Sequence, residues 1–599
     1  MFPSRRAEFA TDRATPETDR ATPETDLAAH GTDRAAHGTD LAAHGTDRVA
    51  HGTDLAAHGT DRATHGTDRV AHGTDRVAHG TDRVAHGTDR VAHGTDRATH
   101  GTDLAAHGTD RVAHATDRAA HGTDRAAHGT YRAATARERT SRRDLLFRAA
   151  NGFGGLALLN LLHAAERKQP HFAPKAKSVI FLFMDGGPSQ MDTFDPKPRL
   201  AQDNGKPLPF RPPTTVFNIS DKILGSPFAF KQYGQSGAWV SDQFPHVAGC
   251  VDDMAIIRSM VADHSEHTAA NYFIHSGSGF QGRPSMGAWV NYGLGSASDN
   301  LPGFVVLESG LVPPGGMDCF GSGFLPASYQ GTLFRQGEHP IADLTPATDE
   351  QRAAQTGKLA LLRKLNSGAV QRFGHVSEIE ATIANYELAY RMQSAVPDLL
   401  DLSKESEATK KMYGIGAEPT DEFGRECLLA RRLVERGVRF VELLTPARKG
   451  LDRWDQHASL EKGHRLNAQS TDQPIAALLK DLKTTGLLKD TLVIWGGEFG
   501  RTPCAQFSEG ADTATYGRDH NPFGFTMWMA GGGVKGGQTI GATDEFGYFA
   551  IENKIHMHDL HATMLHLLGL DHKRLTFPYS GRDMRLTDVH GNLVKELLA

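Results

Sequence analysis

From residue 171 onward, short apolar runs alternate with amphipathic stretches, the alternation expected when strands and helices follow one another. The apolar runs predict strands at 178–184, 254–257, 304–307, 438–444, 491–495 and 525–530. The amphipathic stretches predict helices at 268–275, 377–395, 422–435, 471–485 and 558–568. Strand–helix alternation of this kind predicts a parallel sheet covered by helices on both faces.

Residues 340–415 interrupt the alternation with a long helical excursion, which we expect to pack as a cap beside the sheet. The predicted architecture for 171–599 is therefore an α/β fold: a three-layer α/β/α sandwich with a mostly parallel central sheet. A domain of about 430 residues buries a core large enough to be stable without disulfide bonds. The four cysteines lack the CxxC spacing of a zinc site, and we predict free, buried thiols.

The first quarter of the chain, residues 1–136, consists largely of a seven-residue repeat close to HGTDRVA. A period of seven suggests a coiled coil, but each unit contains a glycine, which costs about 1 kcal/mol in a helix, and offers only small apolar residues. We therefore predict a disordered, low-complexity region. Weak metal binding by the repeated histidines is the alternative.

Residues 137–170 contain Arg142 and Arg143, which are followed by a moderately apolar run and then by charged residues. This pattern predicts a twin-arginine export signal. The apolar run is shorter than the about 20 residues of a membrane span, so no stable span is expected. This predicts export to the periplasm or cell envelope, with the twin-arginine export machinery as a partner. The alternative is an amphipathic helix that caps the domain. A signal this far from Met1 also predicts a downstream start codon.

Acids and imidazoles follow several predicted strands, and five of them are candidate metal ligands: Asp185, Asp455, His457, Glu498 and His520. Asp455 and His457 are two residues apart, so their side chains point the same way in an extended segment. Open α/β sheets place their sites at the carboxyl ends of strands. The sequence therefore predicts a site for one or two divalent ions, with Zn²⁺, Mg²⁺, Mn²⁺ and Ca²⁺ all open. For Asp185 a turn or helix-capping role is the alternative.

Three further residues are candidates for catalysis. His267 lies in a histidine-rich segment before a predicted helix and suits proton transfer or metal binding. Ser189 is a candidate nucleophile, although a helix N-cap is the stronger interpretation. Arg501 suits bidentate binding of a phosphate or sulfate oxygen, with an ion pair to Glu498 as the alternative. Asp559 is predicted to cap the helix that follows it.

Net charge excludes one class of partner. The chain carries a formal charge of −6 and no dense patch of lysine and arginine, so nothing favours nucleic-acid binding. A small molecule or a glycan ester is the expected substrate.

Several motifs together resemble the bacterial domain of unknown function 1501 family, which is commonly exported by the twin-arginine route and assigned to the alkaline phosphatase and sulfatase superfamily. They are FMDGGPSQMDTFDPKP, DQPIAALLKDL, GEFGRTP, GRDHNPFGFTMWMAGGGVKGG and DLHATMLHLLGLD. The resemblance covers 140–599 and implies an alkaline phosphatase-like fold with its metal site at the strand ends. It also implies that Asp185 is the first-strand metal ligand, that Asp455 and His457 form the Asp/His pair, and that His520 is the late histidine.

This sequence departs from the superfamily pattern at two positions. Counting back from Ser276-Gly277 places His267 where a nucleophilic cysteine, serine or threonine is expected, so formylglycine-dependent sulfatase activity is not expected. Glu498 stands near the usual Asp-His pair and leaves one histidine ligand missing. The expected function is an exported metal-dependent hydrolase of phosphate or sulfate esters, with attack by His267 or metal-bound water. The alternative is a non-catalytic cell-envelope binding protein that retains the fold.

Overall fold

The computed structural model describes residues 169–215, 220–309, 312–335, 377–446, 453–506 and 515–599, with a few isolated residues between 337 and 365 and ten residues of the repeats. The predicted export signal, almost all of the predicted disordered region and much of 340–376 lie outside the described residues. The chain divides into two compact units, 1–155 and 156–599.

In the first unit the described residues are five two-residue strands, β1 to β5, at His37–Gly38, His51–Gly52, His65–Gly66, His79–Gly80 and His93–Gly94. They pair in parallel in sequence order, each with its histidine opposite the next histidine. Consecutive strands start two seven-residue repeats apart, which explains why identical residues meet. The predicted disorder of residues 1–136 stays a prediction, because almost all of these residues lie outside the part of the chain that the structure describes.

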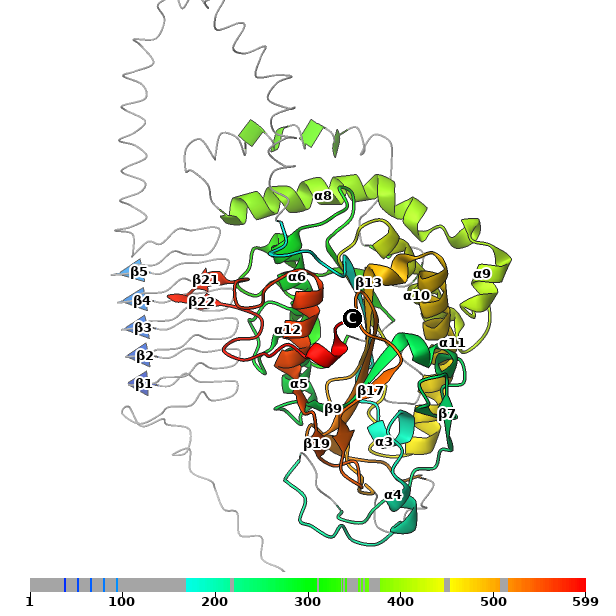
Figure 1. Ribbon diagram of the computed structural model, residues 1–599. Helices are drawn as coiled ribbons and strands as arrows, with labels where there is room; N and C mark the ends of the chain where they lie inside the picture. Colours follow the sequence, from blue (N-terminus) through cyan, green and yellow to red (C-terminus); the bar gives the residue numbers. More distant parts are fainter. Residues whose placement is uncertain are drawn as a thin grey trace, which may run out of the picture. The chain divides into compact units, whose positions relative to one another are not determined.

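A nine-stranded sheet lies at the centre of the second unit (Figure 1). Eight strands follow one another in the order β11 (Thr332–Arg335), β10 (Phe304–Glu308), β12 (Phe440–Leu444), β6 (Ser178–Phe183), β13 (Thr491–Gly496), β16 (Phe525–Gly531), β9 (Met254–Val261) and β17 (Gln538–Ile540). β20 (Ile555–His556) also pairs with β9. Only the pairings of β16 with β13 and with β9 are antiparallel, so the predicted mostly parallel sheet is confirmed.

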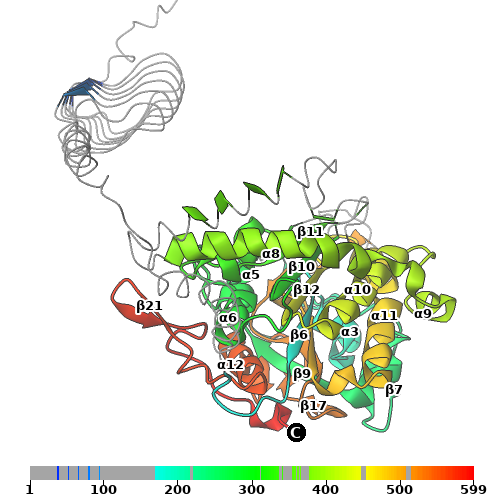
Figure 2. The ribbon, with the colours of Figure 1, turned by 90° about the horizontal axis from the view of Figure 1, so that it is seen from above.

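Helices cover both faces of this sheet (Figure 2). Alternate residues of a strand point to opposite faces, and accordingly Ile180 and Leu182 of β6 belong to one core cluster whereas Val179 and Phe181 belong to the other. The first cluster is covered by α8 (Ser377–Leu400), α10 (Asp421–Glu435) and α11 (Leu460–Thr484). The second is covered by α5 (His267–Ser276), α6 (Met286–Leu294) and α12 (Met557–Leu567). The predicted three-layer sandwich is confirmed.

Helix α11 is the element whose bounds differ most from the prediction, because it begins at Leu460 rather than at residue 471. Its first half contains weak helix formers such as Gly463 and Asn467, which mask the helical signal in the sequence. Both are buried, so tertiary packing decides the conformation there. The helix then continues through Pro474, which also lies in the core.

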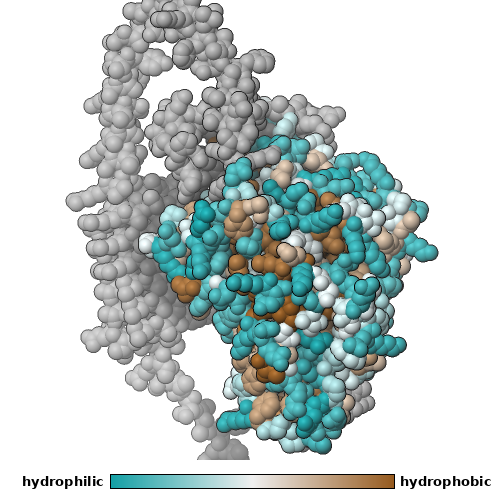
Figure 3. Space-filling view, viewed as in Figure 1, coloured by the Kyte–Doolittle hydropathy of each residue, from teal (hydrophilic) through white to brown (hydrophobic). Residues whose placement is uncertain are grey.

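No helix in the described part of the chain is long and apolar enough to cross a membrane. Figure 3 shows a face covered largely by hydrophilic residues, with apolar ones in patches between them. The four cysteines, at 250, 319, 427 and 504, are free and buried, as predicted.

Candidate metal centre

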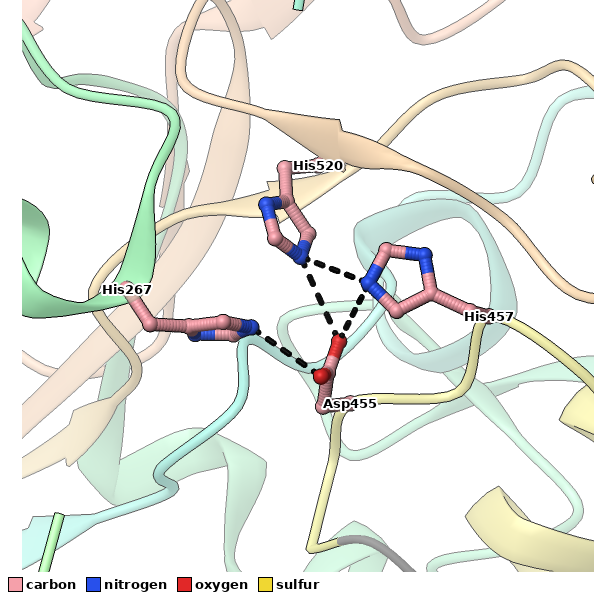
Figure 4. Close-up of side chains that lie close together, drawn as sticks. All are labelled: His267, Asp455, His457 and His520. Atoms are coloured by element: carbon pink, nitrogen blue, oxygen red, sulfur yellow. Dashed lines mark hydrogen bonds and ion pairs between the residues drawn. The ribbon is translucent and has the colours of Figure 1, made fainter. Parts of the chain in front are cut away.

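Four side chains from three separate segments converge near the carboxyl end of β6 (Figure 4). His267 is the first residue of α5, Asp455 and His457 lie just before α11, and His520 lies in β15 (His520–Asn521). One ligand atom of each lies within 4.8 Å of the others. The structure thus brings together three of the five predicted ligands, with His267 as the fourth group.

The carboxylate of Asp455 lies at the middle of this cluster. Its Oδ2 is 3.1 Å from Nε2 of His267, and its Oδ1 is 2.9 Å from Nε2 of His457 and 3.3 Å from Nε2 of His520. The Nε2 atoms of His457 and His520 are themselves only 2.9 Å apart. Three imidazole nitrogens and a carboxylate oxygen that face one another form a donor set suited to a single transition-type divalent ion.

The opposite ring nitrogen of each histidine is held by an oxygen atom. Nδ1 of His267 lies 2.7 Å from Oε1 of Glu498, Nδ1 of His457 lies 2.5 Å from Oε1 of Gln506, and Nδ1 of His520 lies 2.6 Å from the carbonyl oxygen of Ser265. A proton on each Nδ1 satisfies these contacts and leaves the Nε2 lone pair facing the cluster, which is how histidine ligands are oriented in metal sites. Sequence reasoning missed Gln506, which belongs to no motif, and it did not foresee that the backbone carbonyl of Ser265 would hold His520.

Local structure explains why the four groups meet. The side chain of Glu266 caps α5 by accepting hydrogen bonds from the backbone N–H groups of Thr268 and Ala269, at 2.9 and 3.1 Å, and so fixes the helix start at His267. β15 pairs with β14 (Gly500–Arg501), which sets His520 opposite Arg501. Gly186 has a φ of 102°, and a Cβ atom there would lie 2.5 Å from the backbone nitrogen of Asp455. Only glycine allows that close approach.

Glu498 and Asp185, the other two predicted ligands, lie beside the cluster rather than in it. Glu498 is fully buried and accepts hydrogen bonds from the backbone N–H of Gly186, at 3.1 and 3.2 Å, as well as from His267. Its observed role is to orient His267. Asp185 is 2% exposed and forms an ion pair with Arg453, a residue that sequence reasoning did not consider although it lies two positions before Asp455.

Arg501 does not have the position predicted for a residue that binds a substrate oxygen. It is fully buried, and its guanidinium donates to the carbonyl oxygens of Gly186, of Gly187 at 3.0 Å and of Arg518 at 3.1 Å. It also lies 2.6 Å from Oδ1 of Asp455. The guanidinium therefore holds the Asp455 carboxylate in place.

Ser189 does not have the surroundings of a nucleophile. Its side chain is fully buried, its hydroxyl donates to Oδ2 of Asp192 at 2.5 Å, and its backbone N–H donates to Nε2 of His464 at 3.0 Å. It occupies the N-cap position of α3 (Gln190–Thr193), but its hydroxyl does not cap that helix. Asp192 is paired in turn with the buried Arg518.

Burial and neighbouring charges set the protonation of the cluster. Burial lowers the pKa of His520 to about 4, so its imidazole is neutral at pH 7. Burial also opposes protonation of His267, but the hydrogen bonds and charges of Asp455 and Glu498 outweigh it and raise the pKa of His267 to about 9. Without a metal, His267 therefore carries a proton held between two carboxylates. Metal binding would displace that proton.

The histidines near the C-terminus have structural roles. Asp559 accepts the backbone N–H of His556 at 3.0 Å within a capping box, as predicted for a helix cap. Nε2 of His558 lies 3.0 Å from the carbonyl oxygen of Gly277, and Nε2 of His561 lies 2.7 Å from that of Ile274. These contacts join α12 to α5.

A family model described as "Protein of unknown function (DUF1501)" matches residues 176–598. No curated protein matches the chain significantly.

Three solved structures are among those to which the chain is similar. The lipoteichoic acid synthase LtaP from Listeria monocytogenes is 9% identical, with 70% of this chain and 78% of that chain covered and a TM-score of 0.29. The sulfatase PsFucS1 from Pseudoalteromonas sp. is 11% identical, with 69% and 70% covered and a TM-score of 0.28. Alkaline phosphatase from the Antarctic bacterium TAB5 is 11% identical, with 67% and 100% covered and a TM-score of 0.26. Because all three TM-scores are below 0.5, the fold is taken from the strand order above.

Proposed function

The chain belongs to the DUF1501 family of proteins of unknown function, and from the centre itself we propose that it is a metal-dependent hydrolase of phosphate or sulfate esters. One observation carries the proposal: three histidine Nε2 atoms face the carboxylate of Asp455, and each of these histidines has its Nδ1 held by an oxygen atom. Such ordering of imidazoles with their lone pairs converging is the design of a metal-binding site.

The donor set narrows the choice of ion. Mg²⁺ and Ca²⁺ prefer all-oxygen sites, whereas three imidazoles and one carboxylate suit Zn²⁺ or a similar transition ion. A bound ion would supply Lewis acidity to an ester oxygen and lower the pKa of a water molecule toward about 7. The chain's own part is to hold the ligands: Arg501 fixes Asp455, and Glu498 fixes His267.

A non-catalytic binding protein is the second candidate, and the burial of Ser189 favours it. Because this hydroxyl is bonded to Asp192 and has no exposed surface, it offers no nucleophile. In the hydrolase, attack by water would then have to replace it, because both ring nitrogens of His267 are engaged at the centre. A location in the periplasm or cell envelope remains a proposal based on the 137–170 segment alone.

Metal content tests the proposal most directly. The full-length chain, loaded with Zn²⁺ and dialysed, is expected to retain at least one more ion per chain by plasma mass spectrometry than the Asp455→Ala/His457→Ala double variant, which keeps any metal held by the repeated histidines. The matched control is Asp263→Ala/His556→Ala, another Asp–His pair at 3.0 Å that lies outside the cluster. Equal metal in the parent and the Asp455/His457 variant would contradict the site.

Activity separates the two candidate functions. Metal-dependent turnover of an aryl phosphate or an aryl sulfate that is absent from the Asp455→Ala/His457→Ala variant would support the hydrolase. Stoichiometric metal without turnover of either class of ester would favour the binding protein.

A further inference from the structure

Arg453 is a cation at the centre with part of its hydrogen-bonding capacity unused. Its Nη1 contacts Oδ2 of Asp185, and its Nη2 donates to the carbonyl oxygen of Val312 at 2.8 Å. Its Nε has no hydrogen-bond partner among the residues that the structure describes. The side chain is 14% exposed, so Arg453 is not sealed from solvent as Arg501 is, although its Nε atom is buried.

Arg501 differs in each of these respects. Its side chain has no exposed surface, and its Nε, Nη1 and Nη2 all contact protein oxygen atoms. A substrate anion could reach it only by displacing Asp455 or the backbone carbonyls. Of the two arginines, therefore, Arg453 is the one positioned to contact a ligand.

Arg453 supplies the positive charge beside the buried carboxylate of Asp185. A carboxylate this buried requires a cation nearby, and the charge that contacts Asp185 is the guanidinium of Arg453. Glu498, the other carboxylate at this edge, is already bonded to Gly186 and His267. A second ion would have to compete with a cation that is already in place.

We propose that Arg453 takes the place of a second metal ion: its guanidinium neutralises Asp185 and binds the anionic group of the ester, so that the centre holds one divalent ion. A guanidinium suits this role because it remains charged when partly buried and presents several donors to a phosphoryl or sulfuryl oxygen. The inference rests on the proposed function, since it assigns the anion-binding group of that same site.

Metal stoichiometry tests the first part of the proposal, that the centre holds one divalent ion. By plasma mass spectrometry we expect the full-length parent and Asp185→Asn each to hold one Zn²⁺ more than Asp455→Ala/His457→Ala, whose content gives any zinc held by the repeated histidines. A difference of two ions for the parent, or no difference for Asp185→Asn, would overturn the inference while leaving the proposed function intact. No difference for the parent would instead refute the proposed function.

Anion binding tests the second part of the proposal, that the guanidinium of Arg453 binds the anionic group of the ester. With Zn²⁺ bound, inorganic phosphate and sulfate are titrated into the chain by calorimetry, and Arg453→Met is expected to weaken the tighter of the two at least tenfold while retaining the ion. Arg453→Lys is expected to restore part of that loss, because it keeps the charge without the planar fork. The control Arg425→Met removes an exposed arginine from α10 and is expected to change nothing.

Two results would contradict the anion-binding role. One is an unchanged anion affinity in Arg453→Met, and the other is a metal-loaded parent chain that binds neither phosphate nor sulfate. Thermal melting of each variant shows whether it is folded, and Arg453→Lys keeps the test decisive if Arg453→Met fails to fold.

Discussion

Replacing Glu442 by leucine is expected to lower the free energy of unfolding by about 3–5 kcal/mol, the usual cost of leaving one partner of a buried ion pair alone. Glu442 lies on the central strand β12, 1% exposed, and its Oε1 is 2.6 Å from Nε2 of His275 on α5. Nδ1 of His275 lies 2.6 Å from the carbonyl oxygen of Asn271. With both ring nitrogens facing acceptors, His275 is held as a buried imidazolium, which leucine would leave unpaired.

The loss of unfolding free energy in Glu442→Leu should be larger at acidic than at alkaline pH. Burial disfavours the charged imidazole, but the charge and hydrogen bond of Glu442 outweigh it, so the pKa of His275 is raised in the folded state. A raised pKa stabilises the fold fully below the unfolded value of about 6.5, and that contribution is lost as pH rises through the folded pKa. Urea unfolding of the parent and Glu442→Leu should therefore differ most at or below pH 6 and less at alkaline pH.

The control for this comparison is Glu552→Leu, the same substitution at an exposed position of β19 (Ala550–Glu552). It is expected to leave the unfolding midpoint nearly unchanged at every pH. A Glu442→Leu variant as stable as this control at pH 6 would show that the pair contributes nothing to the fold.

The sequence predicted the fold well because the sheet is buried on both faces. The strand at residues 178–184 is a continuous apolar run, and the structure places β6 there with all six of its residues buried. Amphipathic stretches such as 422–435 likewise became α10. The first half of α11 was missed because its glycine and polar residues carry no helical periodicity, and only tertiary contacts reveal it.

The candidate site was predicted in part. Asp455 and His457 share a motif, and His520 lies in a turn just before a predicted strand, so residue type and position relative to the strands identified all three. The roles of Arg501 and Ser189 depended on whether their polar atoms would face a cavity or the protein interior, and no local pattern encodes that difference. Arg453 was missed for the same reason, since its significance comes from Asp185, which is 268 positions away in the chain.

Changing Glu498 to glutamine is expected to weaken Zn²⁺ binding by about 10- to 100-fold, the typical effect of altering a residue that orients a metal ligand. Glutamine keeps the shape and can still accept the backbone N–H of Gly186, but it removes the negative charge beside Nδ1 of His267. His267 then becomes a weaker donor to the ion. The measurement is competition for Zn²⁺ against a chelating dye of known affinity, with Glu545→Gln, an exposed acid, as the matched control.

Thermal melting of the metal-free forms completes this test, because it separates the orientation of His267 from the packing of Glu498. The metal-free Glu498→Gln chain should melt below the parent, because it loses the ion pair with the protonated imidazole of His267, and the rise in melting temperature on adding Zn²⁺ should shrink as well. Unchanged zinc affinity in Glu498→Gln would mean that His267 needs no orienting charge.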